Sequence, residues 1–154
     1  MRYFITAISF LLLISCNNEI NHKAEITPIP ISKGENDEEK LKQLIISKGD
    51  IDAYKALSII YLDYAYPEEF IYYALVMANK FNYPQAQYDV FSCLTDTYIG
   101  NINTIDEDSA NLAISYLLKA YKNGHHQAKS MVNEYDIKYD IKENKKYLIK
   151  IFGD

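Results

Sequence analysis

The sequence contains no tryptophan, only two cysteines, five glycines and four prolines among its 154 residues. So few glycines and prolines exclude a collagen-like or loop-rich chain. Two cysteines exclude the disulfide framework that holds together many small secreted domains. The formal net charge is −5, so no basic surface argues for nucleic acid as a partner. The remaining composition, 49% hydrophobic and 24% charged, is that of one ordinary globular domain.

The first residues have the organisation of a secretory signal peptide. One positive charge, Arg2, precedes an apolar run from Tyr3 to Ile14. At 1.5 Å per residue this run would cover about 18 Å, which is too short for a hydrocarbon core of about 30 Å. It has instead the length of the apolar region of a signal peptide. The run ends in Leu13-Ile14-Ser15-Cys16, which resembles the lipobox of bacterial lipoproteins.

The lipobox resemblance implies a membrane anchor without a spanning helix. In that family the peptide before the cysteine is removed and the cysteine is acylated, so residues 1–15 would be the signal peptide and Cys16 the lipidated residue. Asn17 is not the Asp that enterobacterial sorting reads as inner-membrane retention. We therefore expect a periplasm-facing envelope protein on the outer rather than the inner membrane. The alternative is an uncleaved helical anchor in which Cys16 is incidental.

A tether and a helical domain follow the lipobox. Residues 16–36 contain Pro28, Pro30 and Gly34 and show no sustained hydrophobic period, which predicts a flexible tether. Over residues 37–154 the apolar residues recur at i, i+3, i+4 and i+7. This spacing predicts helices throughout the second segment.

Several helix boundaries can be predicted within the helical segment. Pro67 and Pro84 are expected at the first positions of two helices, where a missing N–H costs nothing. Glu107 and Asp108 suit the positive end of another helix dipole, and residues 100–104 are expected to form a loop. The pattern predicts an all-α fold of six or seven short helices, with the last segment capping the domain.

The helical segment contains an internal repeat. Each copy has a helix end, then a residue that tolerates positive φ, then a small residue that begins the next helix. A small residue at that point lets two helices pack closely. The three copies are Ile45-x3-Gly49-x3-Ala53, Ala78-x3-Asn82-x3-Ala86 and Ala120-x3-Gly124-x3-Ala128.

The stretch from Ala86 to Ala128 resembles a Sel1-like repeat, the longer relative of the tetratricopeptide repeat. It matches in Ala86-Gln87-Tyr88-Asp89-Val90 and in the spacing of Ala113, Ala120, Gly124 and Ala128. The stretch before it matches less well, because Ile71 replaces the first alanine and Asn82 the glycine. The resemblance implies a short right-handed α-solenoid of antiparallel helix pairs that serves as a scaffold for binding. The residues given structural roles by the repeat are Gly49, Ala53, Ala78, Asn82, Ala86, Ala113, Ala120, Gly124 and Ala128.

No motif of catalytic or cofactor chemistry is present in the sequence. Adjacent His125 and His126 would point roughly 100° apart on a helix, which makes a poor metal clamp. Residues 106–108 lack the alternating ligands of a calcium loop and are expected to begin a helix. Cys93 falls on an apolar helix face, as a small buried hydrophobe would. Paired carboxylates brought together by the fold remain open, but we expect a non-enzymatic protein without cofactor or metal.

Aromatic side chains are the best candidates for partner binding, because the chain has 15 tyrosines. Tyr54, Tyr88 and Phe91 fall beside the predicted inter-helix stripe, on the first helix of a pair. In repeats of this type that helix tends to line the concave face, where aromatic residues are hot-spot candidates. The alternative is that all three pack against the next repeat.

These features favour a membrane-tethered module of the bacterial envelope that binds another protein. Small, acidic, lipid-anchored Sel1-like proteins resemble immunity proteins, which inhibit a cognate antibacterial effector. A negative charge would also steer a basic partner towards the module. The alternatives are an envelope assembly or signalling scaffold, or a cell-wall-binding factor.

Overall fold

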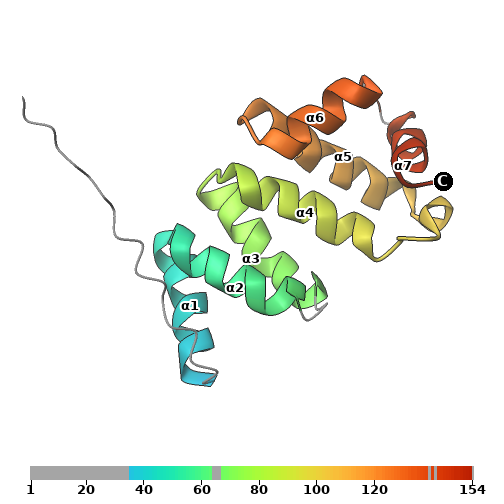
Figure 1. Cartoon of the computed structure of the whole chain (residues 1–154). Coiled ribbons are helices and arrows are strands. Elements are labelled where there is room, and N and C mark those ends of the chain that lie inside the picture. The colour runs from blue at the N-terminus through green and yellow to red at the C-terminus, as the bar shows by residue number, and fades with distance from the viewer. Residues whose placement is uncertain (1–34, 64–66, 139, 141, 154) are drawn as a thin grey trace, which may run out of the picture.

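The computed structural model describes residues 35–63, 67–138, 140 and 142–153. Within these ranges the chain is helical and contains no strand, which confirms the predicted all-α class. Figure 1 shows the helices following one another from α1 at one end of the molecule to α6 and α7 at the other. They are α1 (Glu35–Lys48), α2 (Ile51–Asp63), α3 (Pro67–Lys80), α4 (Pro84–Asp96), the 3-10 helix η1 (Ile102–Thr104), α5 (Glu107–Lys122), α6 (His126–Tyr135) and α7 (Asn144–Phe152).

The helix starts agree with the predicted ones. Pro67 and Pro84 are the first residues of α3 and α4, where proline's fixed φ suits the first turn. Glu107 begins α5, and Asp106 before it caps the helix by accepting the Ser109 N–H at 2.8 Å. The acidic run at 106–108 therefore begins a helix, as expected. The loop expected at 100–104 contains the short helix η1, which was not predicted.

The three helices that end in the register of the repeat are followed by residues with a left-handed backbone, as α6 is by Asp136. Gly49 has φ 65°, Asn82 φ 53° and Gly124 φ 86°. At Gly124 the His125 N–H donates to Ala120 O at 2.9 Å, and the Gly124 N–H donates to Tyr121 O at 3.1 Å. This pair of bonds is a Schellman motif, which satisfies the last carbonyls of α5. The repeat register therefore coincides with the turns that lead into α2, α4 and α6.

Neighbouring helices pack through small residues. α1 packs against α2 and α3, α3 against α4, α4 against α5, and α5 against α6 and α7. Because α4 lies between α3 and α5, it is buried on both sides and carries buried polar as well as apolar side chains. A larger side chain at these crossings would cost about 1–3 kcal/mol. The buried alanines of the repeat are Ala53, Ala78, Ala86, Ala113, Ala120 and Ala128.

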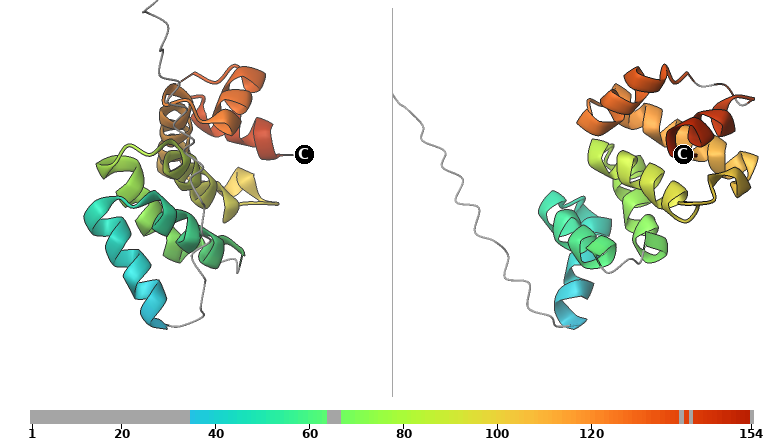
Figure 2. Two further views of the ribbon diagram at one scale, coloured as in Figure 1. Left: turned by 60° about the vertical axis from the view of Figure 1, so that its left-hand side comes forward. Right: turned by 45° about the vertical axis from the view of Figure 1, so that its right-hand side comes forward.

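The C-terminal segment packs onto the helical domain. α7 contacts α5, α6 and η1, and the views in Figure 2 agree on its position beside α5. Leu148 of α7 is completely buried. Asn144, at the start of α7, is also completely buried, and its Nδ2 donates to Asn111 Oδ1 on α5 at 2.9 Å. Both apolar and polar contacts therefore fix the last helix in place.

Candidate protein-docking site

The three aromatic residues expected at a partner surface differ in their exposure. Tyr54 and Phe91 are each only 1% exposed and belong to the hydrophobic core. This corrects the expectation that they contact a partner directly, because neither ring reaches the surface. They pack between helices instead: Tyr54 against Phe70 of α3, with ring centroids 5.2 Å apart, and Phe91 against Phe152 of α7, 6.1 Å apart. Tyr88 is half-buried and is the only one of the three with an exposed part.

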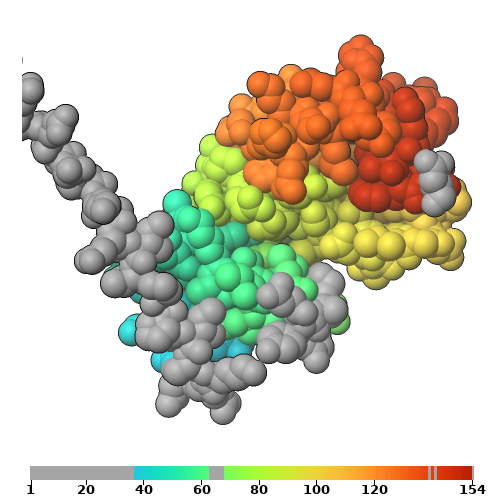
Figure 3. All heavy atoms as spheres, viewed as in Figure 1, coloured from blue at the N-terminus to red at the C-terminus, as the bar shows by residue number. Residues whose placement is uncertain are grey.

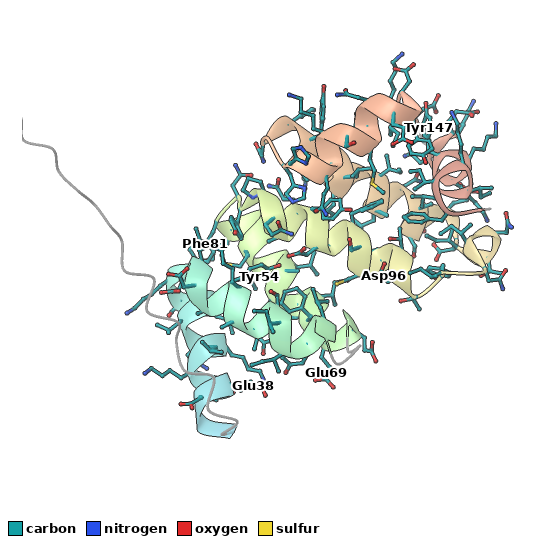
Figure 4. All side chains as sticks on the ribbon, in the orientation of Figure 1. Glu38, Tyr54, Glu69, Phe81, Asp96 and Tyr147 are labelled. Carbon is teal, nitrogen blue, oxygen red and sulfur yellow. The ribbon has the colours of Figure 1, made fainter. Side chains whose placement is uncertain are left out.

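Tyr54 ties α2 to α4 through a buried carboxylate. Its hydroxyl donates to Asp89 Oδ2 at 2.7 Å, and Gln85 Nε2 donates to Asp89 Oδ1 at 2.8 Å. Figure 4 shows Tyr54 in the middle of the molecule, where α2 faces α4. A buried carboxylate requires donors of this kind, because leaving it without them would be costly. This contact connects α2 and α4, the helices that follow two successive turns of the repeat.

Burial controls the protonation of the groups around Asp89. Desolvation raises the pKa of the Asp89 carboxyl, although the hydrogen bonds from Tyr54 and Gln85 act in the opposite direction. Desolvation and the nearby Asp89 charge also raise the pKa of the Tyr54 hydroxyl. The same two causes raise the pKa of the buried Cys93 thiol to about 12. Cys93 is therefore a neutral thiol at ordinary pH and lacks the character of a nucleophile.

His125 extends this polar network to α6. Its Nδ1 accepts the Ala128 N–H, with 3.3 Å between the nitrogens, so this nitrogen carries no proton. Nε2 must then carry the proton, and it donates to Gln85 Oε1 at 2.9 Å. The ring also stacks on Tyr88, with centroids 4.5 Å apart and planes 21° from parallel. Side-chain bonds therefore run continuously from α2 through α4 to the start of α6.

A second set of amides joins two of the turns. Gln87 Nε2 donates to Asn82 Oδ1 at 2.8 Å, and Asn123 Nδ2 donates to Gln87 Oε1 at 2.9 Å. Gln87 is buried, and these two bonds give both the nitrogen and the oxygen of its amide a partner. Among the residues that the structure describes, no buried side-chain polar atom lacks a partner. A fully satisfied network of this kind fixes one arrangement of the helices.

The solvent-facing side of α2 carries an apolar stripe. Ile51, Ile59 and Leu62 are 44%, 51% and 39% exposed, and their positions fall on one side of the helix. The opposite side of α2 is buried against α1 and α3. We call Ile51, Ile59 and Leu62 the α2 stripe. It was not predicted from the sequence, because α2 is apolar on both sides and periodicity alone does not say which side faces solvent.

Exposed apolar area and exposed acidic side chains also occur on α3 and at the start of α2. Tyr72 on α3 is 54% exposed. Asp52 is exposed beside Ile51, and the exposed Glu68 and Glu69 lie at the start of α3, where Figure 4 labels Glu69. Lys55 lies within the stripe and is 3.8 Å from Asp52 in an exposed ion pair. Figure 3 shows the N-terminal helices as one end of the molecular surface, away from α5 to α7.

The described ranges contain neither a candidate metal site nor a helix that could span a membrane. No group of three His, Cys, Asp or Glu side chains there could hold a metal ion. None of the described helices is both long and apolar enough to cross a membrane. Cys16, the signal peptide predicted at 1–15 and all but the last two residues of the 16–36 tether lie outside the described residues.

Comparison with known proteins adds no relative: no protein-family model, no curated protein and no solved structure matches this chain.

Proposed function

We propose that this chain is a membrane-tethered, non-enzymatic protein-binding module of the bacterial envelope, and that the α2 stripe is its contact face. The observation that carries the proposal is the exposure of three large aliphatic side chains on one side of α2. Isolated exposed apolar residues are ordinary, but an aligned set is typical of an interaction surface. Tyr72 adds an aromatic side chain of the type that dominates binding energy.

The proposed partner is a protein that presents an apolar ridge flanked by basic residues. Asp52 lies at one end of the α2 stripe, and Glu68 and Glu69 follow the other end. The whole chain also has a net charge of −5. Complementary charge around an apolar centre speeds association and selects the partner. In the narrower form of the proposal the partner is an antibacterial effector that this chain inhibits.

We further propose that the helices form a short right-handed Sel1-like solenoid of antiparallel pairs. Two observations support this arrangement. Positive φ recurs at Gly49, Asn82 and Gly124, in the register of the repeat. Side-chain hydrogen bonds also connect α2, α4 and α6, the helices that follow these three turns. A rigid stack of this kind would present the α2 stripe in a fixed geometry, which lowers the entropic cost of binding.

The test is affinity capture from envelope extracts with the full chain and two variants. The first variant, Ile59→Asp with Leu62→Asp, places charge in the α2 stripe. The control, Leu112→Asp, places charge on α5 at a side chain of comparable exposure, 45%. Equal melting temperatures of the variants would show that both remain folded.

The proposal predicts that the wild type and Leu112→Asp capture the same protein and that the stripe variant loses it. If that protein is an enzyme whose activity disappears on binding, the result supports the immunity form, whereas several envelope proteins support the scaffold form. Equal capture by all three chains would contradict the α2 stripe as the contact face. Retention of peptidoglycan without any protein would contradict the protein-binding function itself.

A further inference from the structure

The N-terminal cap of α6 differs from that of α2 in a way that introduces pH dependence. Asp50 and His125 occupy equivalent positions, each three residues before an alanine of the repeat. The Ala53 N–H donates to Asp50 Oδ1 at 2.8 Å, and the Ala128 N–H donates to His125 Nδ1. The oxygens of an ionised carboxylate are acceptors only, so they accept this bond without a competing proton. An imidazole accepts it only while Nδ1 is unprotonated.

Both ring nitrogens of His125 are engaged in the neutral form. Nδ1 caps α6, and the proton on Nε2 reaches Gln85 Oε1 on α4. Protonation would place a hydrogen on Nδ1 directly opposite the Ala128 N–H, so that two donors would face each other. The cap of α6 would be lost. With only ten residues α6 is too short to be stable without its cap and packing.

The charged and titratable groups around His125 do not compensate for that loss. Burial, and after it the neighbouring His126 on α6, disfavour a positive charge on the imidazole and hold the pKa of His125 below its usual 6.5. From α4 the Tyr88 ring stacks on the imidazole and would attract a cation, but it offers no acceptor to the Ala128 N–H. Asp89 acts only through Gln85, which separates it from the imidazole.

We propose that His125 is an acid-sensitive latch on α6: neutral, it accepts the Ala128 N–H and caps the helix, and protonated, it keeps its bond to Gln85 but no longer caps α6. Loss of the cap would loosen the first turn of α6 while leaving Tyr54, Asp89 and the α2–α4 contact in place. The latch rests on geometry within the helical domain and is independent of the proposed partner.

The latch predicts that the folded protein loses stability as the pH falls below 6.5. The folded-state pKa of His125 is lower than the unfolded value of 6.5, so its contribution is fully present above pH 6.5. It decreases as the pH falls from 6.5 to the folded pKa. Asp89 acts with the opposite sign, because its folded pKa is raised and acid relieves the cost of its buried charge. A loss of stability just below pH 6.5 therefore belongs to His125 and not to Asp89.

The experiment measures the melting temperature of the full chain between pH 8 and pH 5 for three sequences. His125→Asn keeps a capping acceptor but cannot titrate in this range. His126→Asn removes the exposed neighbour and is the matched control. We expect the melting temperature to fall with acid in the wild type and in His126→Asn, and to stay nearly level in His125→Asn. Parallel curves for all three chains would overturn the proposal.

Nitrogen-15 NMR of the imidazole rings provides a second readout that does not depend on stability. The latch requires the Nε2–H tautomer of His125 at pH 8. It also requires the amide resonance of Ala128 to move with the His125 titration in the wild type. An Nδ1–H tautomer, or an Ala128 amide indifferent to that titration, would equally overturn it.

Discussion

Gly49 and Gly124 occupy equivalent turns but have different surroundings. A Cβ on Gly49 would lie 2.4 Å from the Phe81 ring, whereas a Cβ on Gly124 would meet nothing within 4 Å. Both residues have a positive φ, where an L-amino acid costs about 1–2 kcal/mol. Figure 4 shows Phe81 at the end of α3, beside the turn from α1 to α2.

We therefore predict that Gly49→Ala destabilises the protein more than Gly124→Ala. Gly124→Ala should cost only the backbone strain, about 1–2 kcal/mol. Gly49→Ala should add the displacement of a packed aromatic ring, a further 1–3 kcal/mol or so. Urea unfolding of the two variants measures the difference. Equal losses would show that Phe81 does not confine the Gly49 turn.

The Tyr54 hydroxyl is predicted to stabilise the fold through Asp89. Tyr54→Phe keeps the ring in the core and removes one donor to the buried carboxylate. A buried hydrogen bond to a charged group is worth about 1.5–3 kcal/mol, and the variant should lose about that much. Tyr72→Phe, at an exposed ring, should cost less than about 0.5 kcal/mol. Chemical denaturation compares the two, and equal stabilities would contradict the role of the Tyr54–Asp89 bond.

Cys93 is predicted to resist thiol reagents in the folded protein. Burial raises the pKa of its thiol to about 12, so the reactive thiolate is scarce at pH 8. With Cys16 lipidated or replaced by serine, alkylation of the folded chain should be slow and should become fast in denaturant. Rapid modification of the native chain would show that the α4 core opens readily.

At the scale of the helices, the sequence predicted those elements that have local signals. Pro67, Pro84 and the acidic residues at the start of α5 mark helix starts, because proline geometry and helix capping are local. Gly49 and Gly124 mark helix ends for the same reason. The helix η1 was missed because Ile102–Thr104 is a single turn without a period.

The candidate site was predicted less well than the helices, and the reason is tertiary. Tyr54 and Phe91 were candidates for a partner surface, with packing between helices as the alternative. Both are buried, because Tyr54 packs on Phe70 of α3 and Phe91 packs on Phe152 of α7. The sequence did hold one unused signal: Asp89 is a carboxylate among the apolar residues of α4. Its partners Tyr54 and Gln85, like the outward direction of the α2 stripe, depend on how helices distant in sequence meet.

The last helix is predicted to contribute to the stability of the whole domain. Leu148 is completely buried where α7 packs on α5, so Leu148→Ala should cost about 2–5 kcal/mol. Lys146→Ala removes only an exposed ion pair with Glu143, and it should leave the stability almost unchanged. Thermal or urea unfolding gives both values. If Leu148→Ala left the stability unchanged, α7 would not unfold cooperatively with the rest of the domain.

At the scale of the whole molecule, the proposed function assigns anchoring and binding to different parts of the chain. The proposed anchor is at Cys16, before α1, while the stabilising networks join α2, α4 and α6. Cys16→Ser should abolish incorporation of labelled fatty acid and shift the protein out of the membrane fraction. Cys93→Ala should leave both properties unchanged. Continued membrane association of unlabelled Cys16→Ser would favour an uncleaved helical anchor.

The central claim is that a partner protein docks on the α2 stripe, and site-specific photo-crosslinking in living cells tests it most directly. A photoreactive amino acid is placed at Ile59 in one chain and at Leu112, which is comparably exposed on α5, in another. We predict one discrete adduct from position 59 and none of the same mass from position 112. An adduct common to both positions, or one that forms only at 112, would contradict the claim.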